Sequence, residues 1–176
     1  MMPMGTARVQ EDGSFELSGL SDRRRIRVTN LPPGWFLKAV TLESADVTDS
    51  GIDFKEGQNV SGIEIVLTQR ATDLSGTVHD GHEQPVTDYV VVAFSSDSRK
   101  WEYQSRFLRS IRPNQEGRFS LKGLPPDEYY LVALEYLEPG EEGDPEQLEK
   151  WKAAGTRVTL AEGEARTLTL KLLPGN

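Results

Sequence analysis

The stretch "EGRFSLKGLPP", Glu116 to Pro126, decides the fold of this chain. An acidic residue followed by Gly117 predicts a turn, and Phe119 and Leu121 lie two apart, so they share one face of a short strand. A second turn follows at Gly123. A strand of alternating residues between two turns is typical of a β-hairpin, so the segment predicts β structure.

The same pattern occurs earlier, in "DGSFELSGL", Asp12 to Leu20. Further along, "KEGQNVSGIEIVL" (Lys55 to Leu67) resembles "AEGEARTLTLKLL" (Ala161 to Leu173). Because the order of these elements is kept as well as their sequence, we predict two tandem modules of the same fold, with the boundary near Arg70.

The second unit, residues 71–176, reads as a succession of short strands. These are "DLSGTV" (73–78), "YVVVAFS" (89–95), "SRFLRSI" (105–111), "GRFSL" (117–121), "EYYLVALEY" (128–136), "TRVTL" (156–160) and "RTLTLKLL" (166–173). Short strands at near-regular spacing predict an all-β fold, an Ig-like or transthyretin-like antiparallel β-sandwich.

One short helix is expected within this second sandwich, near residues 145–154. Asp144 is suited to the N-cap, Pro145 to the first helical position and Gly155 to the C-terminal stop. Trp151 is expected to pack the helix against the sandwich.

The first unit, residues 1–70, is expected to be a partial sandwich whose opening strands are missing, since nothing before Phe15 corresponds to residues 74–94. An incomplete sandwich exposes a sheet edge. Its missing strands could belong to a longer parent chain, come from the second unit, or come from another chain in a strand-exchanged dimer.

The segment Leu74 to Leu134, "LSGTVHDGHEQPV" through "EGRFSLKGLPPDEYYLVAL", resembles the carboxypeptidase regulatory-like domain, a transthyretin-like β-sandwich. The resemblance implies the fold and a place in a larger bacterial protein, extracellular or in the cell envelope. It implies little about function, because such domains act as spacers, supports or binding domains. The implied partners are other domains of a longer chain or another protein.

Composition excludes several classes of function. Lys and Arg number 20 against 28 Asp and Glu, a net charge of −8, so nucleic acid is not an expected partner. No apolar run is long enough for membrane insertion. The absence of Cys removes disulfides and thiol nucleophiles.

A glycan site is the candidate binding site. Trp101 and Tyr103 lie in a polar connection between two strands, where flat aromatic faces could stack on a sugar ring and Arg99, Glu102 and Gln104 could bind its hydroxyls. The alternative is that Trp101 covers the end of the sandwich core.

Other polar clusters are interpreted as solvated surface. The histidines, His79 and His82, lie in a turn with Asp80 and Glu83; "DVTDSGID", with Asp46, Asp49 and Asp53, lacks the spacing of an EF-hand; and Arg23, Arg24, Arg25 and Arg27 suit the solvent face of an edge strand. No metal site, cofactor or catalytic residue is predicted.

The sequence thus favours a non-catalytic structural or interaction module. The alternatives are a carbohydrate-binding module and an accessory domain that supports a peptidase.

Overall fold

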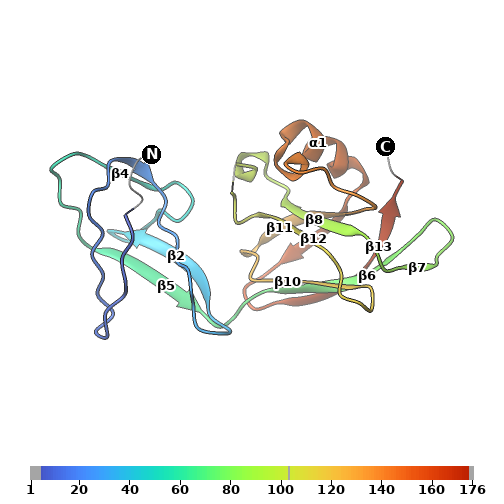
Figure 1. Ribbon diagram of the computed structural model, residues 1–176, viewed down its shortest axis with the longest axis horizontal. Coiled ribbons are helices and arrows are strands. Elements are labelled where there is room, and N and C mark those ends of the chain that lie inside the picture. The colour runs from blue at the N-terminus through green and yellow to red at the C-terminus, as the bar shows by residue number, and fades with distance from the viewer. Residues whose placement is uncertain (1–4, 103, 175–176) are drawn as a thin grey trace. The chain divides into compact units, whose positions relative to one another are not determined.

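The computed structural model describes residues 5–102 and 104–174 and is mostly β-structure with one α-helix (Figure 1). By its internal contacts the chain divides into two compact units, Met1–Thr68 and Gln69–Asn176. The division falls two residues before Arg70, where the sequence places the boundary.

Unit 1 (Met1–Thr68) holds two small antiparallel sheets. β1 (Asp22–Arg24) pairs with β4 (Ile52–Phe54), and β2 (Phe36–Leu42) lies between β3 (Ala45–Asp46) and β5 (Ile63–Thr68). Few of its described side chains are buried: Val40, Thr48, Ile52 and Phe54.

The expected strand around Phe15 and Leu17 is not formed, which corrects the sequence prediction. The turn before it does form, and it repeats the backbone of its counterpart in unit 2. Gln10 N bonds to Ser14 O at 2.8 Å, and Asn114 N bonds to Arg118 O at 2.8 Å. In unit 2 the strand that follows pairs with a strand earlier in the chain; among the described residues of unit 1 no such strand pairs with Phe15.

The second repeated turn also keeps its backbone. Gln58 N donates to Lys55 O at 3.1 Å, and Glu164 N donates to Ala161 O at 3.0 Å. Gly57 and Gly163 occupy the same position with φ of 74° and 72°, where a residue without Cβ is favoured.

Unit 2 (Gln69–Asn176) carries the remaining strands in one continuous set of pairings, in the order β10-β6-β13-β11-β8-β9, with β12 on β11 and β7 on β6. Their bounds are β6 Asp73–His79, β7 Pro85–Val86, β8 Val90–Ser95, β9 Leu108–Ile111, β10 Arg118–Lys122, β11 Asp127–Leu134, β12 Thr156–Leu160 and β13 Ala165–Leu173.

The sequence predicted an antiparallel sandwich, but the sheet is mixed, which corrects that prediction. β13 runs parallel to β6 over Ala165–Lys171 and parallel to β11 at Leu172 and Leu173. β13 is the last strand of the chain. It lies between β6 and β11 and runs parallel to both, so it connects the layer that contains β6 and β10 with the layer that contains β8 and β11.

The inner core of unit 2 lies between these layers. β6, β10 and β13 contribute apolar side chains from one side, and β8, β11 and β12 contribute them from the other, together with Phe107. Tyr129 is fully buried there, and its hydroxyl donates to the Pro125 carbonyl, 2.7 Å away and four residues upstream. A buried tyrosine that bonds back to the preceding corner is a recurrent feature of β-sandwiches.

A second apolar cluster covers the outer face of β8 and β11. Helix α1 (Pro145–Ala154) lies on the side of these strands away from β6 and β10 (Figure 1). The cluster is formed by Val90, Val92, Phe94, Trp101, Val132, Leu134, Leu148 and Trp151. β8 is therefore buried on both faces, which explains its continuous apolar sequence, and Trp151 packs the helix as expected.

The helix begins and ends where the sequence predicts. The Asp144 carboxylate accepts from Glu146 N at 3.0 Å, and Pro145 occupies the first position. Gly155 ends the helix in an extended conformation, with φ −75°. A Cβ there would lie 3.2 Å from both the Trp151 carbonyl oxygen and the Tyr130 Cβ, so a side chain would require these neighbours to move by a few tenths of an ångström.

Candidate functional site

The predicted glycan residues lie in the connection between β8 and β9, which opens with a short 3₁₀ turn, η1 (Ser98–Lys100). Trp101, directly after it, is 6% exposed. Its ring meets Phe94 edge-to-face, with centroids 5.6 Å apart, and its Nε1 donates to the Ser95 carbonyl oxygen at 2.7 Å.

Trp101 therefore offers no open face on which a sugar could stack, and the expected aromatic platform is not formed by this residue. It belongs to the outer core, between the sheet and α1, rather than to the end of the sandwich core. Tyr103, the other expected aromatic, lies outside the described residues.

Among the polar residues of the predicted site, Arg99 is engaged by a neighbouring carboxylate. The Arg99 side chain is 88% exposed and donates two hydrogen bonds to the Asp97 carboxylate, from Nε to Oδ1 at 2.9 Å and from Nη2 to Oδ2 at 2.8 Å. These bonds lower the pKa of the Asp97 carboxyl to about 2. Glu102 and Gln104 are exposed.

The strongest polar network nearby is centred on Asp127 of β11. Its Oδ2 accepts from the Ser95 hydroxyl at 2.7 Å and from Lys100 Nζ at 2.7 Å. A serine, a lysine and a carboxylate in contact resemble a nucleophile with its activators, but Ser95 is fully buried. The network cannot present its hydroxyl to a substrate, and it fixes the start of the connection to β11.

Within the described residues, no three His, Asp or Glu side chains gather as a metal site would require. Asp80 instead accepts from the backbone amides of His82 and Gln84, at 2.8 and 2.9 Å, which closes the turn. These bonds lower the pKa of Asp80. In unit 1, Asp46 accepts from Thr48 N at 2.9 Å.

The arginines at 23–27 lie on and after the short strand β1. Arg24 Nε donates to the Ser21 carbonyl oxygen at 3.0 Å, while Arg23, Arg25 and Arg27 are exposed. Arg23 is thus an exposed strand residue, as expected for the solvent face of an edge strand, whereas Arg25 and Arg27 lie after the strand.

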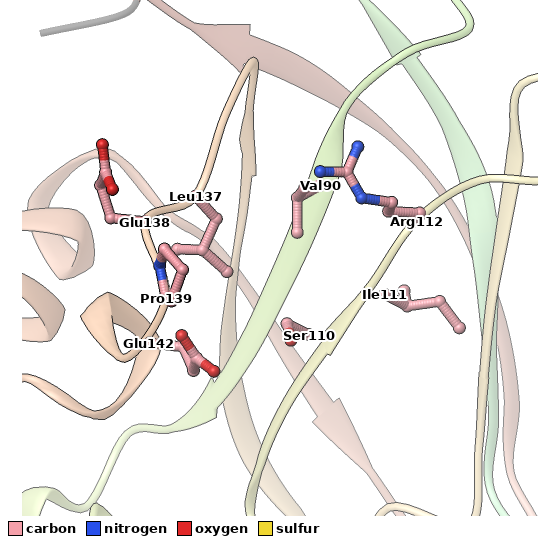
Figure 2. A pocket seen from close by; sticks show the side chains of 8 residues that line it. All are labelled: Val90, Ser110, Ile111, Arg112, Leu137, Glu138, Pro139 and Glu142. Atoms are coloured by element: carbon pink, nitrogen blue, oxygen red, sulfur yellow. The ribbon is translucent and has the colours of Figure 1, made fainter.

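Two shallow hollows lie beside β9, and the sequence did not point to them. The first, of about 230 Å³, lies between β9 and the segment 137–142, which ends in the 3₁₀ turn η2 (Glu141–Gly143) (Figure 2). Its lining comprises Val90, Ser110, Ile111, Arg112, Leu137, Glu138, Pro139 and Glu142. In Figure 2 the Ile111 side chain points away from the segment 137–142.

The second hollow, of about 360 Å³, lies between the end of β9 and β10. It is lined by Ser75, Ile111, Arg112, Pro113, Asn114, Arg118, Phe119 and Ser120. Because the hollows share only residues 111 and 112, they flank the end of β9 from two sides.

No protein-family model matches the chain. No curated protein sequence matches it either.

Solved structures resemble parts of it. A catechol 1,2-dioxygenase from Pseudomonas arvilla C-1 has 14% identity and a TM-score of 0.29 over 36% of this chain and 31% of that chain. The dioxygenase domain of a carbohydrate-binding fusion protein from Streptomyces sp. SirexAA-E has 17% identity and a TM-score of 0.32 over 58% of this chain and 79% of that one. A streptococcal ancillary pilin has 15% identity and a TM-score of 0.38 over 95% of this chain and 49% of that one. The chain thus spans about a third of the first of these and about half of the pilin.

Among the described residues, no helix has the length and apolar character needed to cross a membrane.

Proposed function

We propose that this chain is a non-catalytic structural module of a larger bacterial cell-envelope or secreted protein, of the carboxypeptidase regulatory-like kind that residues 74–134 resemble. In this proposal its units act as a spacer that holds other domains of the parent chain apart. The observation that carries the proposal is the way the connection between the units is fastened to unit 2.

The connection is short. β5 ends at Thr68 and β6 begins at Asp73, and the residues between are held on unit 2. The Thr72 hydroxyl donates to Leu124 O at 2.6 Å, Thr72 O accepts from Gly123 N at 3.0 Å, and Thr72 is buried.

Arg70 and the first residue of β6 also contact unit 2. Asp73 N donates to Glu164 O at 2.9 Å, and the Arg70 side chain lies over Gly163, where an added Cβ would be 3.3 Å from the Arg70 Cβ. The turns at Gly123 and Gly163, which the sequence repeat singled out, thus hold the connection from two sides. The part of the connection that belongs to unit 2 is thus bonded to unit 2 itself, and a spacer requires a short connection of this kind.

The proposal is tested by ¹⁵N relaxation of the intact chain, which reports the tumbling of each unit separately. A spacer predicts one shared correlation time for both units. Inserting Gly-Ser-Gly-Ser between Thr68 and Gln69 should uncouple them. If the parent chain already shows two independent correlation times, the spacer proposal fails.

A second measurement addresses catalysis. Turnover of peptide, ester or glycoside substrates that persists through purification controls would contradict a non-catalytic role. Trp101 is buried, so this residue does not favour the carbohydrate-binding alternative.

A further inference from the structure

β9 is an open edge of the sheet. Among the described residues it pairs with β8 alone, in antiparallel register. Ser95 N donates to Phe107 O at 3.1 Å, so that facing pair is hydrogen-bonded. Because bonded and non-bonded pairs alternate along an antiparallel ladder, Arg109 and Ile111 also bond to β8, and the amide and carbonyl of Ser110 point to the open side.

Both faces of this edge are hollowed. The first hollow contains Ser110 and lies toward Glu138 and Glu142; the second lies between Ile111 and β10. An extended peptide added to an edge strand places alternate side chains on opposite faces. Such a peptide on β9 would have a hollow available for its side chains on each face.

The edge is basic although the chain carries a net charge of −8. Arg109, Arg112 and Arg118 are exposed on or beside the strand; Arg118 lines the second hollow, and Arg112 lines both hollows. Arg112 has one long ion pair, Nη1 to Asp88 Oδ1 at 3.5 Å, with both side chains more than half exposed. Glu116 is the acidic residue of the neighbouring turn, while Glu138 and Glu142 lie on the opposite face, in the first hollow.

We propose that β9 binds an acidic, extended segment of a partner protein by β-strand addition. Backbone bonds to Ser110 would fix the segment, and acidic side chains at every second position would face Arg109 and Arg118. The positions between them would carry small uncharged side chains, because Glu138 and Glu142 repel acidic ones. This goes beyond the spacer role and does not depend on it.

The test is a fluorescence-polarisation titration of the intact chain with a labelled peptide of about seven residues, the length of an ordinary strand. The peptide alternates Asp with Val or Thr, and a matched peptide has Lys in place of Asp. The proposal expects saturable binding of the Asp peptide that weakens with added salt, and at least about tenfold weaker binding of the Lys peptide.

Ser110→Pro is the decisive variant. Proline lacks the amide hydrogen, and the Ser110 amide points away from β8, so the change removes a bond to the peptide while sparing the β8 ladder. We expect binding to fall about tenfold or more with an unchanged melting temperature. Ser110→Ala keeps the backbone amide and should bind like the parent.

Charge reversal gives a test that does not depend on proline being tolerated. Arg109→Glu with Arg118→Glu should weaken the Asp peptide and improve the Lys peptide, whereas Lys150→Glu on the exposed side of α1 should change neither. The proposal is overturned by absent binding, by equal binding of the two peptides, or by binding that a folded Ser110→Pro variant retains. A parent dimer that Ser110→Pro converts to a monomer also overturns it, because the occupant is then a second copy. Each of these outcomes leaves the relaxation test of the spacer role unaffected.

Discussion

The indole Nε1 of Trp101 donates a hydrogen bond of 2.7 Å to the carbonyl oxygen of Ser95. Ser95 is the last residue of β8, and its other polar atoms are engaged as well. Its amide donates to Phe107 O, and its hydroxyl donates to Asp127 and accepts from Asp97 N at 3.1 Å. One buried serine thus ties down both ends of the connection between β8 and β9.

Trp101→Ala is expected to destabilise unit 2 by about 3–5 kcal/mol, the usual cost of deleting a buried aromatic side chain. The change leaves a cavity between β8 and α1 and removes the bond to Ser95. Urea unfolding followed by tryptophan fluorescence, in a Trp35→Phe background so that Trp151 alone reports in the variant, measures the loss. Arg99→Ala, in the same connection but exposed, should cost far less. A Trp101→Ala protein with parent stability that loses retention on a polysaccharide would instead restore the glycan interpretation.

Asp127→Ala is expected to cost about 1–3 kcal/mol, because the buried Ser95 hydroxyl loses its acceptor. Lys100 loses the same partner but can reach solvent, so its contribution is small. Hydrogen exchange should report the loss locally, as faster exchange in the residues after β8. Glu149→Ala, which removes an exposed pair with Lys152 on α1, serves as the control. Equal effects of the two changes would contradict the assigned network.

Acid should weaken this region through Asp97. Its pKa in the folded chain is about 2, below the ordinary value of 3.8, chiefly because the Arg99 side chain bonds to it. A carboxyl with a lowered pKa stabilises the fold above its ordinary pKa, and this contribution is lost as the pH falls from about 3.8 toward 2. Carboxyl ¹³C titration by NMR should give this low pKa in the parent. Arg99→Ala should bring it back toward 3.8; an unchanged pKa in that variant would exclude the ion pair as its cause.

The sequence predicts unit 2 well because its signals are local. The alternation of Phe119 and Leu121, the apolar run of β8 and the caps of α1 each appear in the structure where the pattern places them. Strand pairing is not local. Nothing in residues 165–173 distinguishes a strand that pairs antiparallel from one that lies parallel to β6, so the mixed sheet could not be predicted.

The sequence left open whether Trp101 is exposed or part of the core, for a similar reason. In a two-layer sandwich a tryptophan in a polar connection is either exposed or covers the end of the core, but α1 adds a third layer, and Trp101 fills the space between sheet and helix. The helix was predicted and so was its packing through Trp151; what the sequence did not reveal is that both tryptophans meet the same face. At Phe15 the sequence pattern predicted a strand that the structure does not form. Among the described residues no strand pairs with this segment, and a strand sequence without a partner remains a loop.

Gly76 of β6 offers the sharpest test of the sheet order. It faces Phe119 on β10 and Leu168 on β13, and an added Cβ would overlap the Leu168 carbonyl oxygen. Its φ is not in the left-handed region, so the requirement is for space rather than for conformation. Gly76→Ala should therefore push β13 from β6 and leave unit 2 largely unfolded by circular dichroism. Gly81→Ala is the matched control, because nothing lies within 4 Å of its Cβ position and its φ is also not left-handed. If Gly76→Ala melts like the control, β13 does not lie beside β6, and the joining of the two layers through that strand is wrong.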